Sequence, residues 1–208
     1  MLRNSTLAWG WPAKALHWIG AILILLLLGH GWWMTHLAPR GPDRLLHYAG
    51  HAALGYDFLV LLLLRMLWRW LNPVPAMPPG TKRWEALAAQ LGHLGLYVLM
   101  FATTIVGWAL AGTMRAPMQK DVFGLTFPAI FGDKSWHGSL EDTHKVLAYV
   151  LAALIVVHIG GALRHHFVKK NDVLRRMVRW PHAAVRGLSA FEAKLSEQQQ
   201  SECNDRLR

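Results

Sequence analysis

The stretch "THKVLAYVLAALIVVHIGGALRHHF", residues 143–167, decides the fold. Its apolar run is long enough to cross a bilayer as a helix, which takes roughly 20 residues, yet it carries His144 and His158. In a helix, the fourteen positions that separate them correspond to a rise of roughly 21 Å and bring the side chains back to within about 40° of one face. An imidazole at membrane depth is costly unless it faces a partner inside a bundle. The spacing therefore predicts two functional sites along one helix face, one in each leaflet.

The composition extends this prediction to the whole chain. Of its 208 residues, 53% are hydrophobic, and four stretches have apolar cores with almost no charge: residues 13–35, 48–71, 87–112 and 142–168. We therefore expect an all-α integral membrane protein. Residues 1–180 would form a four-transmembrane-helix bundle, and residues 181–208 a polar cytoplasmic tail to which we assign no chemistry. The first stretch is read as a retained helix, because no small-residue cleavage site follows a short hydrophobic core.

The positive charges predict the orientation in the membrane. Sixteen of the 22 Lys and Arg residues lie at the termini, in the loop after the second stretch or at the helix ends beside them. This excess predicts that both termini lie in the cytoplasm, with residues 113–141 as an extracytoplasmic loop that can cap a site. The net charge of +10 is then explained by the positive-inside rule and by contact with anionic membrane lipid. Nothing indicates a soluble nucleic-acid-binding domain.

Helix direction pairs the histidines by depth. The first helix starts in the cytoplasm, so His17 lies near the level of His158, late in the last helix; the second starts outside, so His51 lies near His144. Two facing neutral imidazoles suit the axial positions of an iron porphyrin, and the prediction is a bundle that binds two haems. Zinc would require three or four ligands per site, and a proton relay more carboxylates than the helices offer.

Other residues near these levels are secondary candidates. His47 lies one turn before His51 and is the alternative ligand on the second helix. His93 is expected near the cytoplasmic-side haem, where it hydrogen-bonds a propionate, lines a quinone pocket or is an ordinary core residue. Arg65 and Arg164 are read either as partners of haem propionates or as cations that reach the lipid headgroups. Six glycines, read either as openings for a flat macrocycle or as helix-packing sites, are Gly55, Gly92, Gly95, Gly107, Gly160 and Gly161.

Several segments together resemble one known family. They are "ALHWIG" at 15–20, His51 four residues before Gly55, and the segments "LLRMLWR" at 63–69, "LGHLGLYVLMF" at 91–101, "VFGLTFPAI" at 122–130 and "ALRHHFVKKNDVLRRM" at 162–177. Over about residues 8–180 the chain resembles the bacterial cytochrome b561 family, which is related to nickel-hydrogenase cytochrome b subunits. The resemblance implies a diheme inner-membrane electron carrier with His17, His51, His144 and His158 as axial ligands. It also makes His165 a candidate near a quinone headgroup, and His137 an alternative to His144.

The resemblance implies two classes of function. One is an electron relay between a membrane quinone and an extracytoplasmic protein, such as a periplasmic redox protein or the rest of a hydrogenase-type complex. The other is an enzyme that oxidises superoxide and passes the electron to ubiquinone. A superoxide site would need positive charge at the outer surface, where the six candidates are Arg40, Arg44, Arg115, Lys120, Lys134 and Lys145. The two readings stay open at this point.

Overall fold

The computed structural model is nearly all-helical. It describes residues 2–6, 8–39, 41, 43–78, 80–114, 120–122, 125–130 and 132–178, and the predicted tail of residues 181–208 lies outside this part of the chain. The four long helices are α1 (Trp11–His36), α2 (Arg44–Leu71), α3 (Arg83–Gly112) and α4 (His137–Phe167). Each is long and apolar enough to cross a membrane, so the expected all-α fold with four candidate membrane helices is confirmed.

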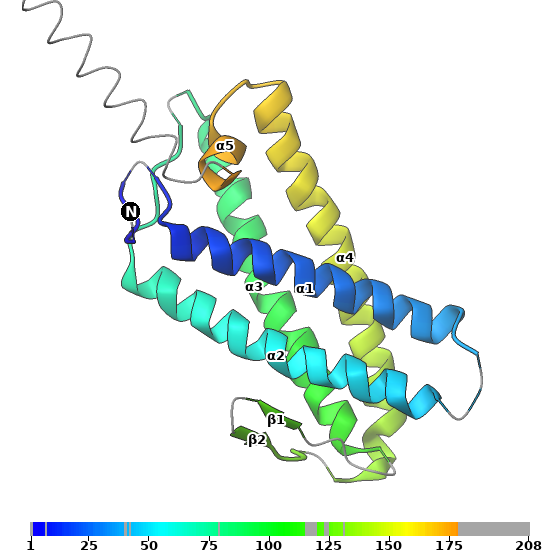
Figure 1. Ribbon diagram of the computed structural model, residues 1–208. Helices are drawn as coiled ribbons and strands as arrows, with labels where there is room; N and C mark the ends of the chain where they lie inside the picture. Colours follow the sequence, from blue (N-terminus) through cyan, green and yellow to red (C-terminus); the bar gives the residue numbers. More distant parts are fainter. Residues whose placement is uncertain are drawn as a thin grey trace, which may run out of the picture.

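The helices form two antiparallel hairpins. α1 packs along α2, α3 packs along α4, and α2 joins the hairpins through its contact with α3 (Figure 1). Three of the helices begin four or five residues before the expected start, at Arg44, Arg83 and His137. The reason is physical: a hydropathy pattern marks the segment inside hydrocarbon, whereas a helix continues through the polar headgroup layer, where charged residues are allowed.

Two ends of the bundle can be distinguished. At the N-terminal end, the Asn4 amide donates to the Pro73 carbonyl oxygen at 3.0 Å, and the Ala76 N–H donates to Thr6 at 2.8 Å. Helix α5 (Val173–Val178) joins this end, because the Trp18 indole N–H donates to the Met177 carbonyl oxygen at 3.1 Å. The N-terminal segment, the loop after α2 and α5 are therefore fastened together.

The opposite end carries a short hairpin that the sequence did not reveal. Strands β1 (Lys120–Val122) and β2 (Leu125–Phe127) pair antiparallel, and a 3₁₀ turn, η1 (Lys134–Trp136), leads into α4. Strands this short give no readable alternation of apolar and polar residues. Because the Trp108 indole N–H donates to the Pro128 carbonyl oxygen at 2.8 Å, this segment is attached to α3. We call this end of the bundle the β-hairpin end.

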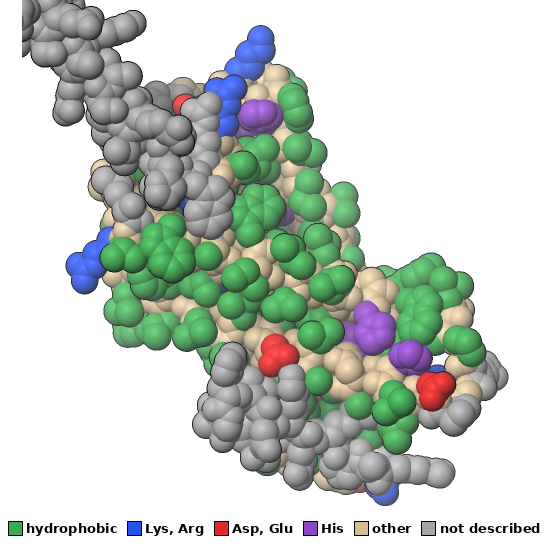
Figure 2. Space-filling model, in the orientation of Figure 1, with side chains coloured by type: hydrophobic (Ala, Val, Ile, Leu, Met, Phe, Trp, Pro, Cys, Tyr) green, Lys and Arg blue, Asp and Glu red, His purple; other side chains and the backbone are tan. Residues whose placement is uncertain are grey.

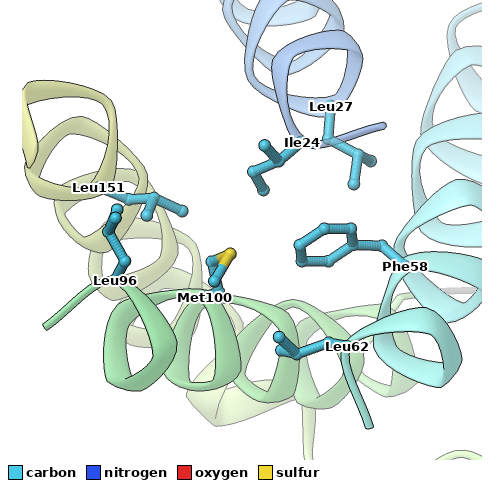
Figure 3. Packing of buried hydrophobic residues seen from close by; sticks show 7 residues of the cluster. All are labelled: Ile24, Leu27, Phe58, Leu62, Leu96, Met100 and Leu151. Atoms are coloured by element: carbon cyan, nitrogen blue, oxygen red, sulfur yellow. The ribbon is translucent and has the colours of Figure 1, made fainter. Parts of the chain in front are cut away.

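The buried core is one apolar layer at mid-length of the bundle. Its residues come from all four helices, point toward one another in Figure 3 and comprise Ile24, Leu27, Phe58, Leu62, Leu96, Met100 and Leu151. On the outside, large apolar side chains are exposed along the helices, among them Trp70 and Val156. Hydrophobic side chains are spread over the helices on the face drawn in Figure 2. This surface suits contact with lipid rather than water.

One buried carboxylate ties the start of α3 to the end of α4. The Glu85 side chain is only 3% exposed and accepts from Arg164 at 3.1 Å, with Lys169 Nζ at 3.3 Å. Its other oxygen accepts the Lys82 backbone N–H at 3.3 Å, which satisfies a free backbone donor at the start of α3. Two cations and the N-terminus of α3 therefore surround one carboxylate. This cluster connects the start of α3 to the end of α4.

We predict that Glu85→Gln lowers the melting temperature of the purified protein in detergent. The amide lacks the negative charge, so Arg164 and Lys169 lose their anion. Asp142→Asn is the matched control, because Asp142 is 83% exposed and lies 4.0 Å from Lys145, and an exposed pair contributes little. An equal melting temperature for the two variants would contradict this account of the clamp.

Candidate haem and electron-transfer site

The described residues include two pairs of facing histidines at different levels of the bundle. The ring centroids of His17 and His158, from α1 and α4, lie 6.5 Å apart with their planes inclined by 72°. Those of His51 and His144, from α2 and α4, lie 6.2 Å apart with their planes inclined by 88°. We call them the first pair and the second pair. The grouping is the one expected from helix direction, and the role of these residues as ligands stays a prediction.

The spacing within each pair fits a metal ion held from two sides. A metal–imidazole bond is about 2 Å long, and the ring centroid lies about 1 Å behind the nitrogen, so two such rings have centroids about 6 Å apart. Elsewhere in the described part of the chain, no three His, Cys, Asp or Glu side chains form a group that could hold a metal. Two axial ligands are the requirement of an iron ion whose other positions are filled by a macrocycle.

Hydrogen bonds within the protein satisfy the paired rings only in part. Nδ1 of His17 and Nδ1 of His51 are buried and find no hydrogen-bond partner within the described residues. Such polar atoms are costly inside an apolar interior. A haem would bind the other ring nitrogen, Nε2, so the fit of a haem at each pair rests on the half-buried rings and their spacing.

Around the first pair the structure gathers positive charge. Arg65 donates its Nε–H to the Tyr97 hydroxyl at 3.1 Å, and its guanidinium carbon lies 5.5 Å from the Tyr97 ring centroid. It is close enough to act electrostatically on both His17 and His158. The guanidinium carbon of Arg69 lies 5.7 Å from the same ring. Neither arginine has a carboxylate partner among the described residues, so both are available to an anionic group.

The other candidate site residues lie in different parts of the bundle. The His93 ring lies 5.3 Å from the His158 ring, so it belongs to the first pair's surroundings. Nδ1 of His165 accepts from the Asn171 amide at 2.8 Å in the turn after α4, at the N-terminal end. Arg164 is held by Glu85, which leaves Arg65 as the stronger candidate for a propionate.

The alternative ligands lie beside the second pair and not within it. The His47 ring is 4.9 Å from Trp33 and 6.1 Å from His30. Nδ1 of His137 lies 2.8 Å from the Thr113 hydroxyl oxygen, and its Nε2 lies 3.9 Å from Glu141. Their positions favour His51 and His144 as the ligands.

The second pair opens into a cavity of about 1260 Å³. This volume exceeds the usual range of about 300–1,000 Å³ for a small-molecule pocket, so the cavity is large enough for a porphyrin. Aliphatic and aromatic side chains line its depth beside His51 and His144. Toward the β-hairpin end its lining is polar and includes three cations and one carboxylate: Arg44, Tyr48, Lys134, His137, Glu141 and Lys145.

Two glycines that touch the second pair carried little or no signal in the sequence. A Cβ at Gly107 would lie 2.8 Å from Cε1 of His144, and a Cβ at Gly31 would lie 3.2 Å from Cε1 of His51. Gly107 was one of six candidate glycines, and Gly31 was not among them. At Gly55, Gly92, Gly160 and Gly161 a Cβ would meet nothing within 4 Å. Which glycine faces a ring depends on the rotation of each helix, which one sequence does not state.

Comparison with known proteins agrees with this geometry. Residues 8–180 match the family model described as prokaryotic cytochrome b561. "Cytochrome b561 homolog 2" of Escherichia coli K12 is 34% identical over 84% of this chain and 93% of its own length. "Probable superoxide oxidase CybB" of Yersinia pestis is 30% identical over 78% and 91%. A "Probable Ni/Fe-hydrogenase B-type cytochrome subunit" of Rhizobium leguminosarum bv. viciae is 24% identical over 85% and 88%.

The match covers the four long helices and both histidine pairs. With its apolar helices, it indicates a bacterial membrane protein whose implied cofactor is b-type haem. This chain belongs to the prokaryotic cytochrome b561 family of membrane-embedded b-type cytochromes.

Proposed function

We propose that this chain is a diheme cytochrome of the bacterial inner membrane. It carries single electrons across the bilayer between a membrane quinone and an extracytoplasmic donor or acceptor. One observation carries the proposal: two imidazole pairs lie at two levels of the bundle, on either side of one apolar layer. A haem held at each pair would supply a one-electron iron couple.

The protein's own residues bind and insulate the two sites. His17 and His158 would hold one haem between α1 and α4, and His51 and His144 would hold the other between α2 and α4. In sequence, every residue of the apolar layer lies between the two levels: Leu151, for example, falls between His144 and His158, and Phe58 between His51 and Arg65. The layer therefore separates the sites and keeps water from the space between them.

We place the N-terminal end in the cytoplasm, as the charge distribution predicts. That end carries Lys82, Arg83, Lys169, Lys170, Arg175 and Arg176 among its described residues, which is the side that the positive-inside rule assigns to the cytoplasm. The first pair then faces the cytoplasmic leaflet and the quinone. His93, beside His158, and His165, in the turn after α4, are the candidates to give or take the protons of quinone chemistry.

The first prediction concerns the purified protein with its haem. A reduced-minus-oxidised optical spectrum with haem quantified per chain should show two b-type haems, and a soluble quinone should reoxidise the reduced protein rapidly. Two haems that a quinone does not reoxidise would contradict the quinone assignment alone. One haem or none would contradict the proposal as a whole.

The second prediction concerns the pairing. His17→Ala and His158→Ala should each remove the same haem, and His51→Ala and His144→Ala should each remove the other, because each haem needs both of its axial ligands. His93→Ala, His47→Ala and His137→Ala are the controls and should retain both haems. Loss of one common haem in His17→Ala and His144→Ala would show that the pairs are assigned wrongly.

A second candidate function is favoured by the cations of the cavity. Arg44, Lys134 and Lys145 line the same cavity as His51 and His144, and such a lining attracts a small anion. Superoxide entering there would lose one electron and leave as dioxygen. Two such electrons, with two protons from the cytoplasm, would convert one quinone to quinol. Glu141 reduces the positive charge, since it lies 2.7 Å from Lys145 Nζ.

The third prediction separates this enzyme from a relay to a protein partner. If superoxide is the substrate, Arg44→Gln and Lys134→Gln should slow haem reduction by superoxide at low salt by on the order of 10-fold, and the rate should depend less on ionic strength. Arg83→Gln, at the other end of the bundle, is the matched control. Stopped-flow measurement of haem reduction is the readout, and rates indifferent to all three substitutions would rule out a steered superoxide site.

A further inference from the structure

Helix α3 contributes neither histidine of the second pair, yet its backbone touches the His144 ring at two points. Nδ1 of His144 lies 3.0 Å from the Thr103 carbonyl oxygen. The edge of the same ring lies against Gly107, where a Cβ would be 2.8 Å from Cε1 and 3.1 Å from Nδ1. Both contacts come from one turn of α3, since Gly107 follows Thr103 by four residues.

The two contacts depend on each other through helix geometry. The Cα–Cβ bond of a helical residue tilts toward the N-terminus, so a side chain covers the turn that precedes its own Cα. A side chain at position 107 would therefore cover the turn that contains Thr103. Because Gly107 has no side chain, the imidazole of α4 reaches the Thr103 carbonyl. Even a methyl group at position 107 would force the ring to move, because real Cβ atoms essentially never approach closer than 3.0 Å.

The hydrogen bond fixes which ring nitrogen carries the proton. A carbonyl oxygen only accepts, so Nδ1 of His144 must be the donor, and the neutral ring then presents the lone pair of Nε2. A hydrogen bond to the second nitrogen of a ligand histidine fixes the ring's orientation and raises its basicity as a ligand.

The partner histidine lacks this support. The His51 ring also packs on a glycine, with Cε1 at 3.2 Å from a Cβ built at Gly31. Its Nδ1, however, is buried and has no hydrogen-bond partner within the described residues. The second pair is therefore asymmetric, with one ring fixed by a backbone carbonyl and the other held by packing alone.

We propose that the Thr103–Gly107 turn of α3 is a positioning element for His144. It sets the tautomer and the angle of this ring, makes His144 the more strongly donating ligand of the pair, and so lowers the midpoint potential of the haem held there. The inference rests on the proposed function, because it takes His51 and His144 as the ligands of that haem.

The test is Gly107→Ala in the purified holoprotein, with Gly29→Ala as the matched control. Gly29 is an exposed glycine of α1 between the levels of the two pairs, and a Cβ there meets nothing within 4 Å. In Gly107→Ala we expect three changes confined to the second haem. Its midpoint potential shifts to more positive values, its low-spin EPR signal moves, and its affinity for the chain falls by about 10-fold or more. The first haem and the control should match the wild type.

The outcomes distinguish this inference from the proposed function. A second haem with unchanged potential, EPR signal and affinity in Gly107→Ala would overturn the positioning role. Retention of both haems in His144→Ala would instead overturn the ligand assignment. If Gly107→Ala does not fold, nitrogen-15 NMR of the reduced wild-type protein gives the answer. A slowly exchanging Nδ1–H signal that is present in the wild type and absent in His144→Ala supports the inference. The lack of such a signal in the wild type, or its retention in His144→Ala, overturns it.

Discussion

A ring nitrogen inside a bilayer needs a partner, and this constraint organises the bundle. Four histidines lie along apolar helices where no water can satisfy them, so they must turn toward the interior and toward one another. The interior then has three levels: the first pair, the apolar layer and the second pair. The rotation of α1, α2 and α4 follows from this arrangement, because each helix must present its histidine inward and its large apolar side chains to lipid.

The four helices contribute different groups to the two histidine pairs and their surroundings. α1, α2 and α4 carry the paired histidines, and α4 carries one of each pair, so its rotation matters at both levels. α3 supplies none of the paired histidines but contributes backbone, through the Thr103 carbonyl and the open side of Gly107, and it is clamped to the end of α4 by Glu85. α3, which carries none of the paired histidines, is thus the helix against which α4, which carries two of them, is aligned.

The sequence predicted what depends on one helix at a time. The apolar runs predicted the four helices. The levels of the histidines were predicted by the interval between His144 and His158 together with the alternating directions of the helices. It did not predict the contacts that depend on how each helix is rotated against its neighbour. In the sequence, nothing distinguishes Gly31 and Gly107 from other small residues, because the rings that they contact belong to other helices. Glu85 likewise resembles any acidic residue in the first turn of a helix, because its partner Arg164 lies on α4. The β1–β2 hairpin was missed because three-residue strands carry no periodic signal.

The apolar layer has a consequence for the energy balance of the membrane. An electron passes between closely spaced cofactors without needing a polar path, whereas a proton needs a chain of water or ionisable groups. The layer that contains Phe58 and Leu151, the most deeply buried side chains among the described residues, offers no such chain. With the two pairs on opposite sides of it, the protein would move charge across the bilayer without a compensating proton leak. Each electron that crosses would then do or require electrical work of roughly 2.3 kcal/mol per 100 mV of membrane potential. The membrane potential, together with the redox partners, would then set the direction of electron flow.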